Sequence, residues 1–180
     1  MRSAHKAHGR FGGGQNNSVK EQTLTEANAG QNSVETVPDQ TTTDMLYILE
    51  EEKLAGDLYE AFFEIYGAKI FDNIAASEDQ HFNAVLSQAN ATDADMDSFV
   101  FEPAGSYVNP EIQELYDDLL AYGSTSLEAA LNVGVAIETK DIIDLQEAAD
   151  AAAGTPLEGV YENLLAGSYN HLDAFEGMLA

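Results

Sequence analysis

Four stretches of this sequence repeat apolar residues at alternating steps of three and four, the spacing that returns to one face of an α-helix. Each of the four stripes is interrupted near its middle by ionisable or hydroxyl groups that a dry core does not favour. The stripes are Ile48, Glu52, Ala55, Tyr59, Phe62 and Tyr66; Phe71, Ile74, Glu78, His81, Val85 and Gln88; Leu127, Leu131, Gly134, Glu138, Asp141, Leu145 and Ala148; and Leu157, Tyr161, Leu164, Ser168, His171, Phe175 and Met178.

If the stripes face one another, four carboxylates and two imidazoles meet in the core, and unbalanced charges there would unfold the protein. The lysines that follow residue 43 are Lys53, Lys69 and Lys140, and none of them lies on a stripe. Metal ions are therefore the natural source of positive charge, and two divalent ions would neutralise four carboxylates. The predicted metal ligands are Glu52, Glu78, His81, Glu138, Asp141 and His171.

The spacing of these residues supports the same interpretation. Glu78 and His81 form an E-x-x-H motif, and a step of three residues places both side chains on one face of a helix, within reach of one ion. Alone, the motif is weak, because a solvated helix acid gives the same letters. The last stripe repeats it as Ser168 and His171, and each motif follows a helix with a central glutamate, as in a duplicated helical pair.

The fold predicted from these patterns is all-α, with no strand required. Residues 1–43 are rich in Gly, Asn, Gln, Ser and Thr without a helical period, so they are expected to form a disordered tail before a single domain over residues 44–180. Asp44 or a preceding Thr is the expected N-cap of the first helix. Helices are predicted over residues 44–66, 69–89, 126–152 and 156–178, with a short helix over 111–122 inside the connection 90–124.

Composition excludes several classes of function. The chain has no Cys, which rules out thiolate metal sites, iron–sulfur clusters and thiol nucleophiles. The formal net charge is -25, and subtracting the four acids and four bases of residues 1–43 from totals of 32 and 7 leaves 28 acids and three lysines on the rest. Such a surface disfavours nucleic acids and anionic membranes. Without a signal-peptide or membrane-spanning pattern, the expected location is the cytoplasm.

Other acids of the first helix lie off its apolar stripe. Glu50, Glu51, Glu60 and Glu64 are therefore predicted to be solvated surface residues without a role in the site. The aromatic residues at helical spacing, such as Phe62 and Phe175 in the stripes, are predicted to be packing residues rather than reactive groups.

Four segments of the chain carry a family resemblance: EEEKLAGDLYEAF, FDNIAASEDQHFNAVL, ALNVGVAIETKDIIDL and LLAGSYNHLDAF. They resemble the ferritin-like superfamily, most narrowly the domain of unknown function 2202 (DUF2202) family and more distantly rubrerythrin-like proteins. The resemblance implies a four-helix bundle with a long crossover that contains an extra helix. It also implies that Glu52 is a ligand with Tyr59 beside the ligands, that Glu78 and Glu138 bridge two ions, and that His81 binds one.

The fourth helix departs from the pattern of the superfamily, because Ser168 stands where a ligand glutamate is expected. Asp141, one turn after Glu138, restores the missing charge. The resemblance implies two metal ions, iron first with Mn or Zn as alternatives, that react with dioxygen or peroxide in oxidative-stress defence or iron handling. Without Cys, an external electron donor would be needed. The alternative is a non-catalytic metal-binding or interaction bundle with a degenerate site. The sequence leaves the oligomeric state open, with a homodimer among the alternatives.

Overall fold

The structure is a computed structural model that describes residues 39–92, 94–97 and 99–180. Within these ranges the chain forms helices and no strand, which confirms the all-α class. Of the predicted tail over residues 1–43, residues 1–38 lie outside the described residues. The helices are α1 (Asp39–Tyr66), α2 (Lys69–Ala91), α3 (Pro110–Gly123), α4 (Leu127–Ala151) and α5 (Pro156–Leu179).

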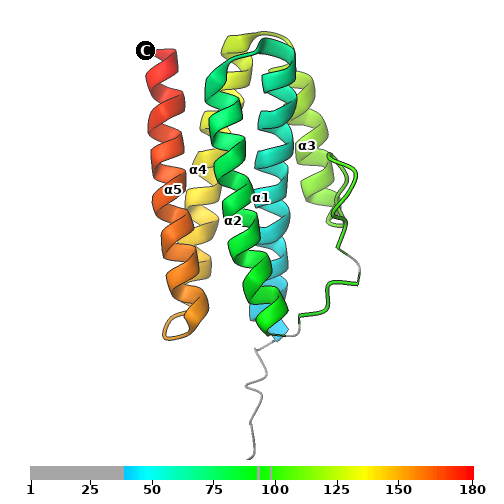
Figure 1. The fold of residues 1–180 in the computed structure, drawn as a ribbon, viewed down its shortest axis with the longest axis vertical. Coiled ribbons are helices and arrows are strands. Elements are labelled where there is room, and N and C mark those ends of the chain that lie inside the picture. Colours follow the sequence, from blue (N-terminus) through cyan, green and yellow to red (C-terminus); the bar gives the residue numbers. More distant parts are fainter. Residues whose placement is uncertain (1–38, 93, 98) are drawn as a thin grey trace, which may run out of the picture. The chain divides into compact units, whose positions relative to one another are not determined.

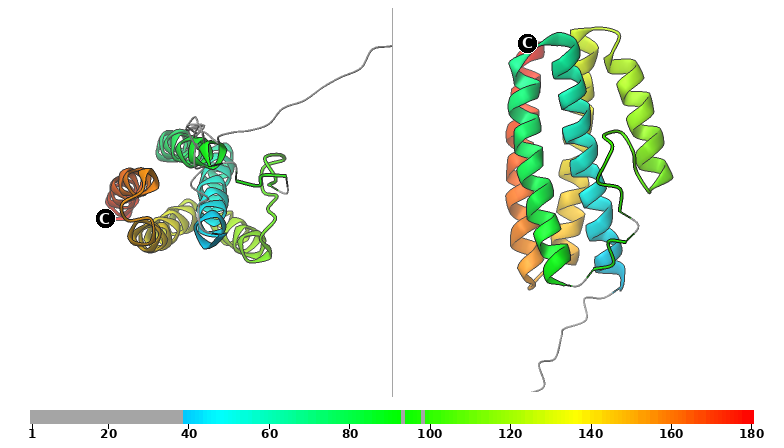
Figure 2. Two further views of the ribbon diagram at one scale, coloured as in Figure 1. Left: turned by 90° about the horizontal axis from the view of Figure 1, so that it is seen from below. Right: turned by 45° about the vertical axis from the view of Figure 1, so that its right-hand side comes forward.

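The four long helices lie side by side, and α3 packs outside them (Figure 1). Neighbouring contacts run from α1 to α2, α2 to α5, α5 to α4 and α4 back to α1, while α3 contacts α1 and α4. The end-on view in Figure 2 shows this arrangement, with α1 between α2, α3 and α4. Tight turns join α1 to α2 and α4 to α5, so each of these pairs is antiparallel. Because α2 and α4 run in the same direction, the segment that joins them returns along the outside and carries α3.

The helix boundaries follow the predicted ones closely, with one difference. α1 begins at Asp39 instead of Asp44, so the residues just before Asp44 extend the helix rather than the expected tail. α1 ends before Gly67, whose φ of 66° is the left-handed conformation that glycine adopts without steric cost. Ser126 caps α4 by accepting a hydrogen bond from the amide of Ala129 at 3.0 Å.

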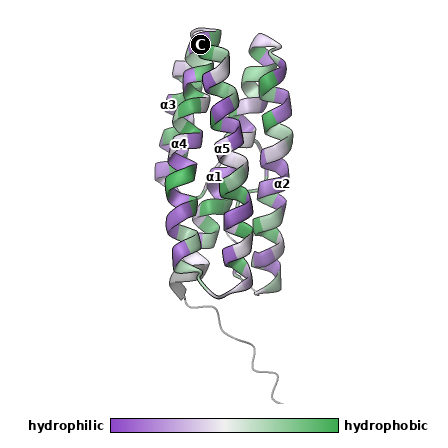
Figure 3. Cartoon of the chain, turned by 90° about the vertical axis from the view of Figure 1, so that its left-hand side faces the viewer, coloured by the Kyte–Doolittle hydropathy of each residue, from purple (hydrophilic) through white to green (hydrophobic). Residues whose placement is uncertain are grey.

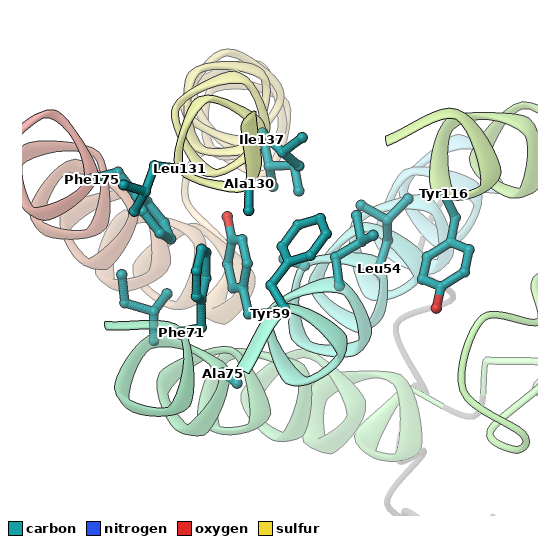
Figure 4. Close-up of a cluster of buried hydrophobic side chains, with 14 of the residues drawn as sticks. Leu54, Tyr59, Phe71, Ala75, Tyr116, Ala130, Leu131, Ile137 and Phe175 are labelled. Carbon is teal, nitrogen blue, oxygen red and sulfur yellow. The ribbon is translucent and has the colours of Figure 1, made fainter. Parts of the chain in front are cut away.

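Two apolar clusters fill the space between the helices, one on either side of the predicted ligands. One cluster is aromatic and includes Tyr59, Phe71 and Phe175, which Figure 4 labels. The other cluster includes Val85 and Leu145 from the C-terminal halves of α2 and α4. The predicted ligands therefore lie in a polar layer between two apolar layers. The ends of two predicted stripes are exceptions, because Leu127 is exposed at the start of α4 and Met178 is exposed near the end of α5.

The prediction that Glu50 and Glu51 are solvated is wrong, since both are buried, whereas Glu60 and Glu64 are exposed as expected. The physical reason is that α1 is covered on two sides. Glu50 accepts hydrogen bonds from the amides of Val108 at 2.6 Å and Asn109 at 3.2 Å in the segment that leads into α3.

Asp57, two turns after Glu50, is the second attachment point of that segment. It accepts hydrogen bonds from the amide of Gly105 at 2.7 Å and the hydroxyl of Tyr107 at 2.7 Å, and its partner cation is Lys53 at 2.6 Å. The outer face of α1 thus anchors the crossover. Hydrophilic residues recur along the outward faces of α2 and α5 (Figure 3). A search of the described helices finds none that is long and apolar enough to span a membrane.

Candidate metal centre

All six predicted ligands are buried at mid-height of the four long helices. α1 provides Glu52 and α2 provides Glu78 and His81, and these residues are 2, 2 and 9 % exposed. The other pair of helices provides Glu138 and Asp141 on α4 and His171 on α5, all similarly buried. Charged groups from four helices therefore converge in one layer, where their unbalanced charge would be costly.

Glu78 lies at the centre of the layer, between two imidazoles. Its Oε2 atom is 2.8 Å from Nδ1 of His81, and its Oε1 atom is 2.8 Å from Nδ1 of His171. The two imidazole rings stack with a centroid separation of 5.4 Å and an interplanar angle of 29°. One donor atom from each of these three residues lies within 4.8 Å of the others, so Glu78, His81 and His171 could together hold a metal ion.

Two further carboxylates flank this cluster almost symmetrically. Oε2 of Glu52 is 3.3 Å from Nδ1 of His81, and Oε2 of Glu138 is 3.4 Å from Nδ1 of His171. Each imidazole nitrogen therefore faces Glu78 on one side and an outer glutamate on the other. The outer carboxylates come from α1 and α4, so the arrangement draws on all four helices.

Several donor atoms in this layer are buried without a hydrogen-bond partner among the described residues. They are Oε1 of Glu52, Oε1 of Glu78, Oδ1 of Asp141, and Nδ1 of both histidines. The imidazole nitrogens are close to carboxylates but lack the alignment of a hydrogen bond. A metal ion bound at roughly 2.1 Å by adjacent ligands separates their donor atoms by about 3 Å, which matches these contacts. The donor set therefore fits a bound metal.

Asp141 does not belong to the cluster of Glu78, His81 and His171, and a separate hydrogen bond orients its carboxylate. The hydroxyl of Ser168 donates to Oδ2 of Asp141 at 2.5 Å, and both residues are buried. This hydrogen bond leaves Oδ1 of Asp141 free of partners among the described residues. Ser168 therefore orients a carboxylate on α4 in this structure.

Tyr59 approaches the site from the aromatic cluster, where Figure 4 shows its oxygen pointing toward α4. Its hydroxyl donates to Oε1 of Glu138 at 2.6 Å. Tyr59 therefore lies beside Glu138, one of the predicted ligands. Burial, together with the charge of Glu138, raises the pKa of Tyr59 well above its usual value, so the phenol keeps its proton.

Two residues that the sequence did not single out fix the orientation of the imidazoles. Nε2 of His171 is 2.9 Å from the hydroxyl of Ser77. Nε2 of His81 lies against Gly167, where an added Cβ atom would stand only 2.5 Å away. Both rings thus present Nδ1 to the carboxylates. A single sequence offers no signal for Ser77, and for Gly167 only the presence of a glycine inside a helix.

The charges of the layer are strongly coupled. Burial by itself would raise the pKa of Glu78, but the contacts with His171 and His81 outweigh it and lower the pKa to about 2. Burial would lower the pKa of both imidazoles, yet the adjacent carboxylates raise it to about 10 for His81 and about 9 for His171. Without metal, protons therefore occupy the imidazole nitrogens.

The pKa values of the outer carboxylates are raised, whereas that of Glu78 is lowered. Burial raises the pKa of Glu52 to about 8 and that of Glu138 to about 7, against the opposing effect of the neighbouring imidazoles. Burial, reinforced by the charge of Glu52, also raises the pKa of Asp141 well above its usual value. The protein alone therefore provides too little positive charge for these acids.

Comparison with known proteins supports the DUF2202 part of the family resemblance. Residues 41–179 match the family described as "Uncharacterized protein domain (DUF2202)". The chain belongs to the DUF2202 family. It is 36% identical over 146 residues to the uncharacterized protein MJ0754 of Methanocaldococcus jannaschii, with 79% of this chain and 77% of that protein covered.

The same relative of this DUF2202 chain also has a solved structure. The crystal structure of the hypothetical protein MJ0754 from Methanococcus jannaschii superposes with a TM-score of 0.74 at 33% sequence identity, covering 91% of this chain and 85% of that one. The helical arrangement is thus similar to that of this relative.

Proposed function

We propose that this DUF2202 chain is a ferritin-like di-metal carboxylate protein that binds Fe(II) and reacts it with dioxygen or peroxide. The observation that carries the proposal is the buried layer in which Glu78 lies between His81 and His171, with unpartnered carboxylate oxygens around it. Packing and hydrogen bonds within the described residues leave this layer short of positive charge, and divalent ions supply it.

Charge balance favours two ions over one. With both imidazoles neutral, as metal ligation requires, the carboxylates of Glu52, Glu78, Glu138 and Asp141 carry four negative charges, and two divalent ions match them. Glu78 is the natural bridge, because its two oxygens face different histidines. His81 with Glu52 would hold one ion and His171 with Glu138 the other, while Asp141 adds its unpartnered oxygen.

The donor atoms favour iron among the available metals. Imidazole suits Fe, Zn, Cu and Ni, carboxylate oxygen suits Mn and Mg, and a mixed set without thiolate suits Fe(II), with Mn(II) and Zn(II) as competitors. When bound, two ferrous ions would supply the two electrons that reduce hydrogen peroxide, with two protons, to two waters, or dioxygen, with two protons, to hydrogen peroxide.

The residues of the chain prepare this chemistry. Tyr59 holds Glu138 and Ser168 holds Asp141, so two of the outer carboxylates keep their orientation while the charge of the site changes. The apolar clusters on both sides of the layer exclude bulk water from it. Return to the ferrous state requires an external electron donor, and such a cycle would serve oxidative-stress defence or iron handling.

A second candidate function rests on Ser168. The position where a ligand glutamate would complete the superfamily pattern holds a hydroxyl that hydrogen-bonds Asp141. A site with this change could hold one Zn(II) or Mn(II) and stabilise the fold without turnover, which makes the protein a metal-binding or interaction module.

Metal analysis together with oxidation kinetics tests the proposal. Purified protein is analysed for bound elements, then titrated anaerobically with Fe(II) and mixed with oxygen or peroxide. Two irons per chain and a transient coloured oxidation product are the expected result. One zinc, or no metal together with an unchanged melting temperature on chelation, favours the module.

In His81→Ala at least one ion should be lost, and unaltered metal content would contradict the ligand assignment.

A further inference from the structure

A small cavity reaches the candidate metal centre from the side. Its volume is about 70 Å³, and its inner wall includes the ligands Glu78, Glu138 and Asp141. Leu115 and Leu119 of α3 form part of the outer wall. A volume of this size holds a few water molecules, whereas pockets for organic ligands measure roughly 300 Å³ or more. The cavity therefore suits small ions and water.

At its outer end, the cavity is lined by residues that are exposed to solvent. Ala136 is exposed and the side chain of Lys140 is 38% exposed, whereas the ligands on the inner wall are buried. Ala136 and Lys140 both belong to α4, one turn apart. The cavity thus leads from the surface of α4, beneath α3, to the ligands.

Lys140 closes the outer end through contacts with three side chains. Its ammonium group pairs with Glu51 of α1 and with Asp144 of α4, and it lies 3.0 Å from the hydroxyl of Tyr47. Lys140 is thus a cation held between two carboxylates at the entrance. Its flexible stem of four carbons allows the ammonium to leave without movement of the backbone.

Glu51 provides the observation that points to a second cation. Its side chain is only 7% exposed, it lines the cavity, and its Oε2 atom is buried with no hydrogen-bond partner in the part of the chain that the structure describes. Lys140 contacts Oε1 of Glu51. Glu51 thus offers the cavity one carboxylate oxygen that the lysine leaves unused, next in sequence to the ligand Glu52.

We propose that Glu51 and Asp144 form a transient binding site for divalent cations, closed by Lys140, through which metal ions enter the candidate metal centre. This proposal rests on the proposed function, because it needs a destination for the ion. The two carboxylates replace part of the hydration shell of an arriving ion when Lys140 moves out. The ion then passes along the cavity to the unpartnered oxygens of Asp141 and Glu78.

The rate of metal uptake by the full-length, metal-free protein tests the entrance. Co(II) is mixed with the protein in a stopped-flow instrument, and binding is followed by the visible absorption of the ion. Glu51→Gln and Asp144→Asn should each slow uptake at least about fivefold, with the number of bound ions at equilibrium unchanged. Lys140→Gln should accelerate uptake, since the competing ammonium is gone.

Asp150→Asn is the matched control. Asp150 is an exposed acid of α4, the helix that carries Asp144, and it does not line the cavity. Its replacement by Asn changes the net charge by the same amount as the other two substitutions. Uptake by Glu51→Gln and Asp144→Asn at the rate of Asp150→Asn would overturn the entrance. A wild-type protein that binds no Co(II) would instead overturn the proposed function. Asp144 is less buried than Glu51, so Asp144→Asn tests the entrance even where Glu51→Gln does not fold.

Discussion

The helical pairs α1–α2 and α4–α5 form the two halves of the candidate centre. Their glutamate and histidine positions correspond, but one carboxylate has a different position in each half. Glu52 and His81 in the first half correspond to Glu138 and His171 in the second. In the first half, the remaining carboxylate is Glu78, three residues before the histidine. In the second half, the same position is Ser168, and the carboxylate is Asp141, one turn after the glutamate, where the first half has Ala55.

This exchange teaches that the number of carboxylates in the layer is kept while the helix that supplies one of them changes. Ser168 is not an empty replacement, because its hydroxyl hydrogen-bonds the carboxylate that has moved to α4. Glu78 contacts both histidines, whereas Asp141 contacts neither in the described geometry. In the proposed centre, the first half would therefore supply the bridge, and the second half would supply a carboxylate at the edge.

The largest effect is expected from removal of the bridge. Glu78→Ala should bind no metal at micromolar concentrations, because both histidines lose their common carboxylate. The corresponding change in the other half, Ser168→Ala, should keep both ions with about tenfold weaker affinity, as for a group that only orients a ligand. Elemental analysis after dialysis measures both, with circular dichroism as the check on folding. Equal losses in the two variants would contradict the unequal roles of the halves.

A smaller effect is expected at the edge of the site. Asp141→Ala should lower the metal content from two ions to one, because the Glu78, His81 and His171 cluster remains. Adding Ser168→Glu to this variant returns a carboxylate to the layer from α5, the arrangement of the first half, and should restore the second ion. Metal content measured by the same analysis decides the matter. A folded double variant that still holds one ion would show that the position of the carboxylate matters more than its charge.

The metal-free and metal-loaded protein should also differ in how their stability depends on pH. In the metal-free protein, the raised pKa values of His81, His171 and Glu52, about 10, 9 and 8, exceed the unfolded values of about 6.5 for His and 4.3 for Glu. The folded state therefore binds extra protons, and their stabilising effect is lost as the pH rises through these values. Glu78, with a pKa of about 2, has the opposite effect only at acidic pH, below about 4.3.

Bound metal replaces these protons, so the loaded protein should not lose stability in this way. The melting temperatures of chelator-treated and Zn(II)-loaded protein should diverge between pH 6 and pH 9, by at least about 5 °C. The net charge of the surface is the same in both samples, so the difference isolates the site. A gap that stays constant or narrows over this range would contradict the account of the buried charges.

The smallest effect is expected at the wall behind His81. Gly167→Ala places a methyl group against Nε2 of His81 and should weaken metal binding about tenfold by turning the ring. Gly177→Ala on the same helix meets no neighbouring atom within 4 Å, so it should raise helix stability by up to about 1 kcal/mol and leave metal binding unchanged. Titration with Zn(II) compares the two, and equal affinities would show that Gly167 does not position the imidazole.

Much of this structure was predictable from the sequence because the spacing of apolar residues and the position of charged residues within that spacing carry independent information. Periodicity predicted the all-α class and the helix boundaries to within a few residues. The interruptions in the stripes predicted which polar side chains are buried, since Glu52, Glu78 and Glu138 fall on the inner face of their helices. These two observations together place each predicted ligand on the inner face of its helix.

The outer face of α1 could not be predicted in the same way. Glu50 and Glu51 are polar residues off the stripe, and most such residues are solvated. The available signal was apolar residues on every side of α1, such as Leu49, Leu54 and Leu58, all buried. A helix that is apolar all round is covered all round. Ser77 and Gly167 were missed because their contacts join helices that only tertiary structure brings together.

α1 is enclosed between α2 and α4 on one side and the α3 crossover on the other. Glu50 and Asp57 fasten its outer face to the crossover on either side of Glu52 in the sequence. In the proposed di-iron centre, its backbone would therefore have little freedom to follow an ion whose radius changes with oxidation state. Rotation of carboxylate side chains, rather than displacement of helices, would absorb that change in size.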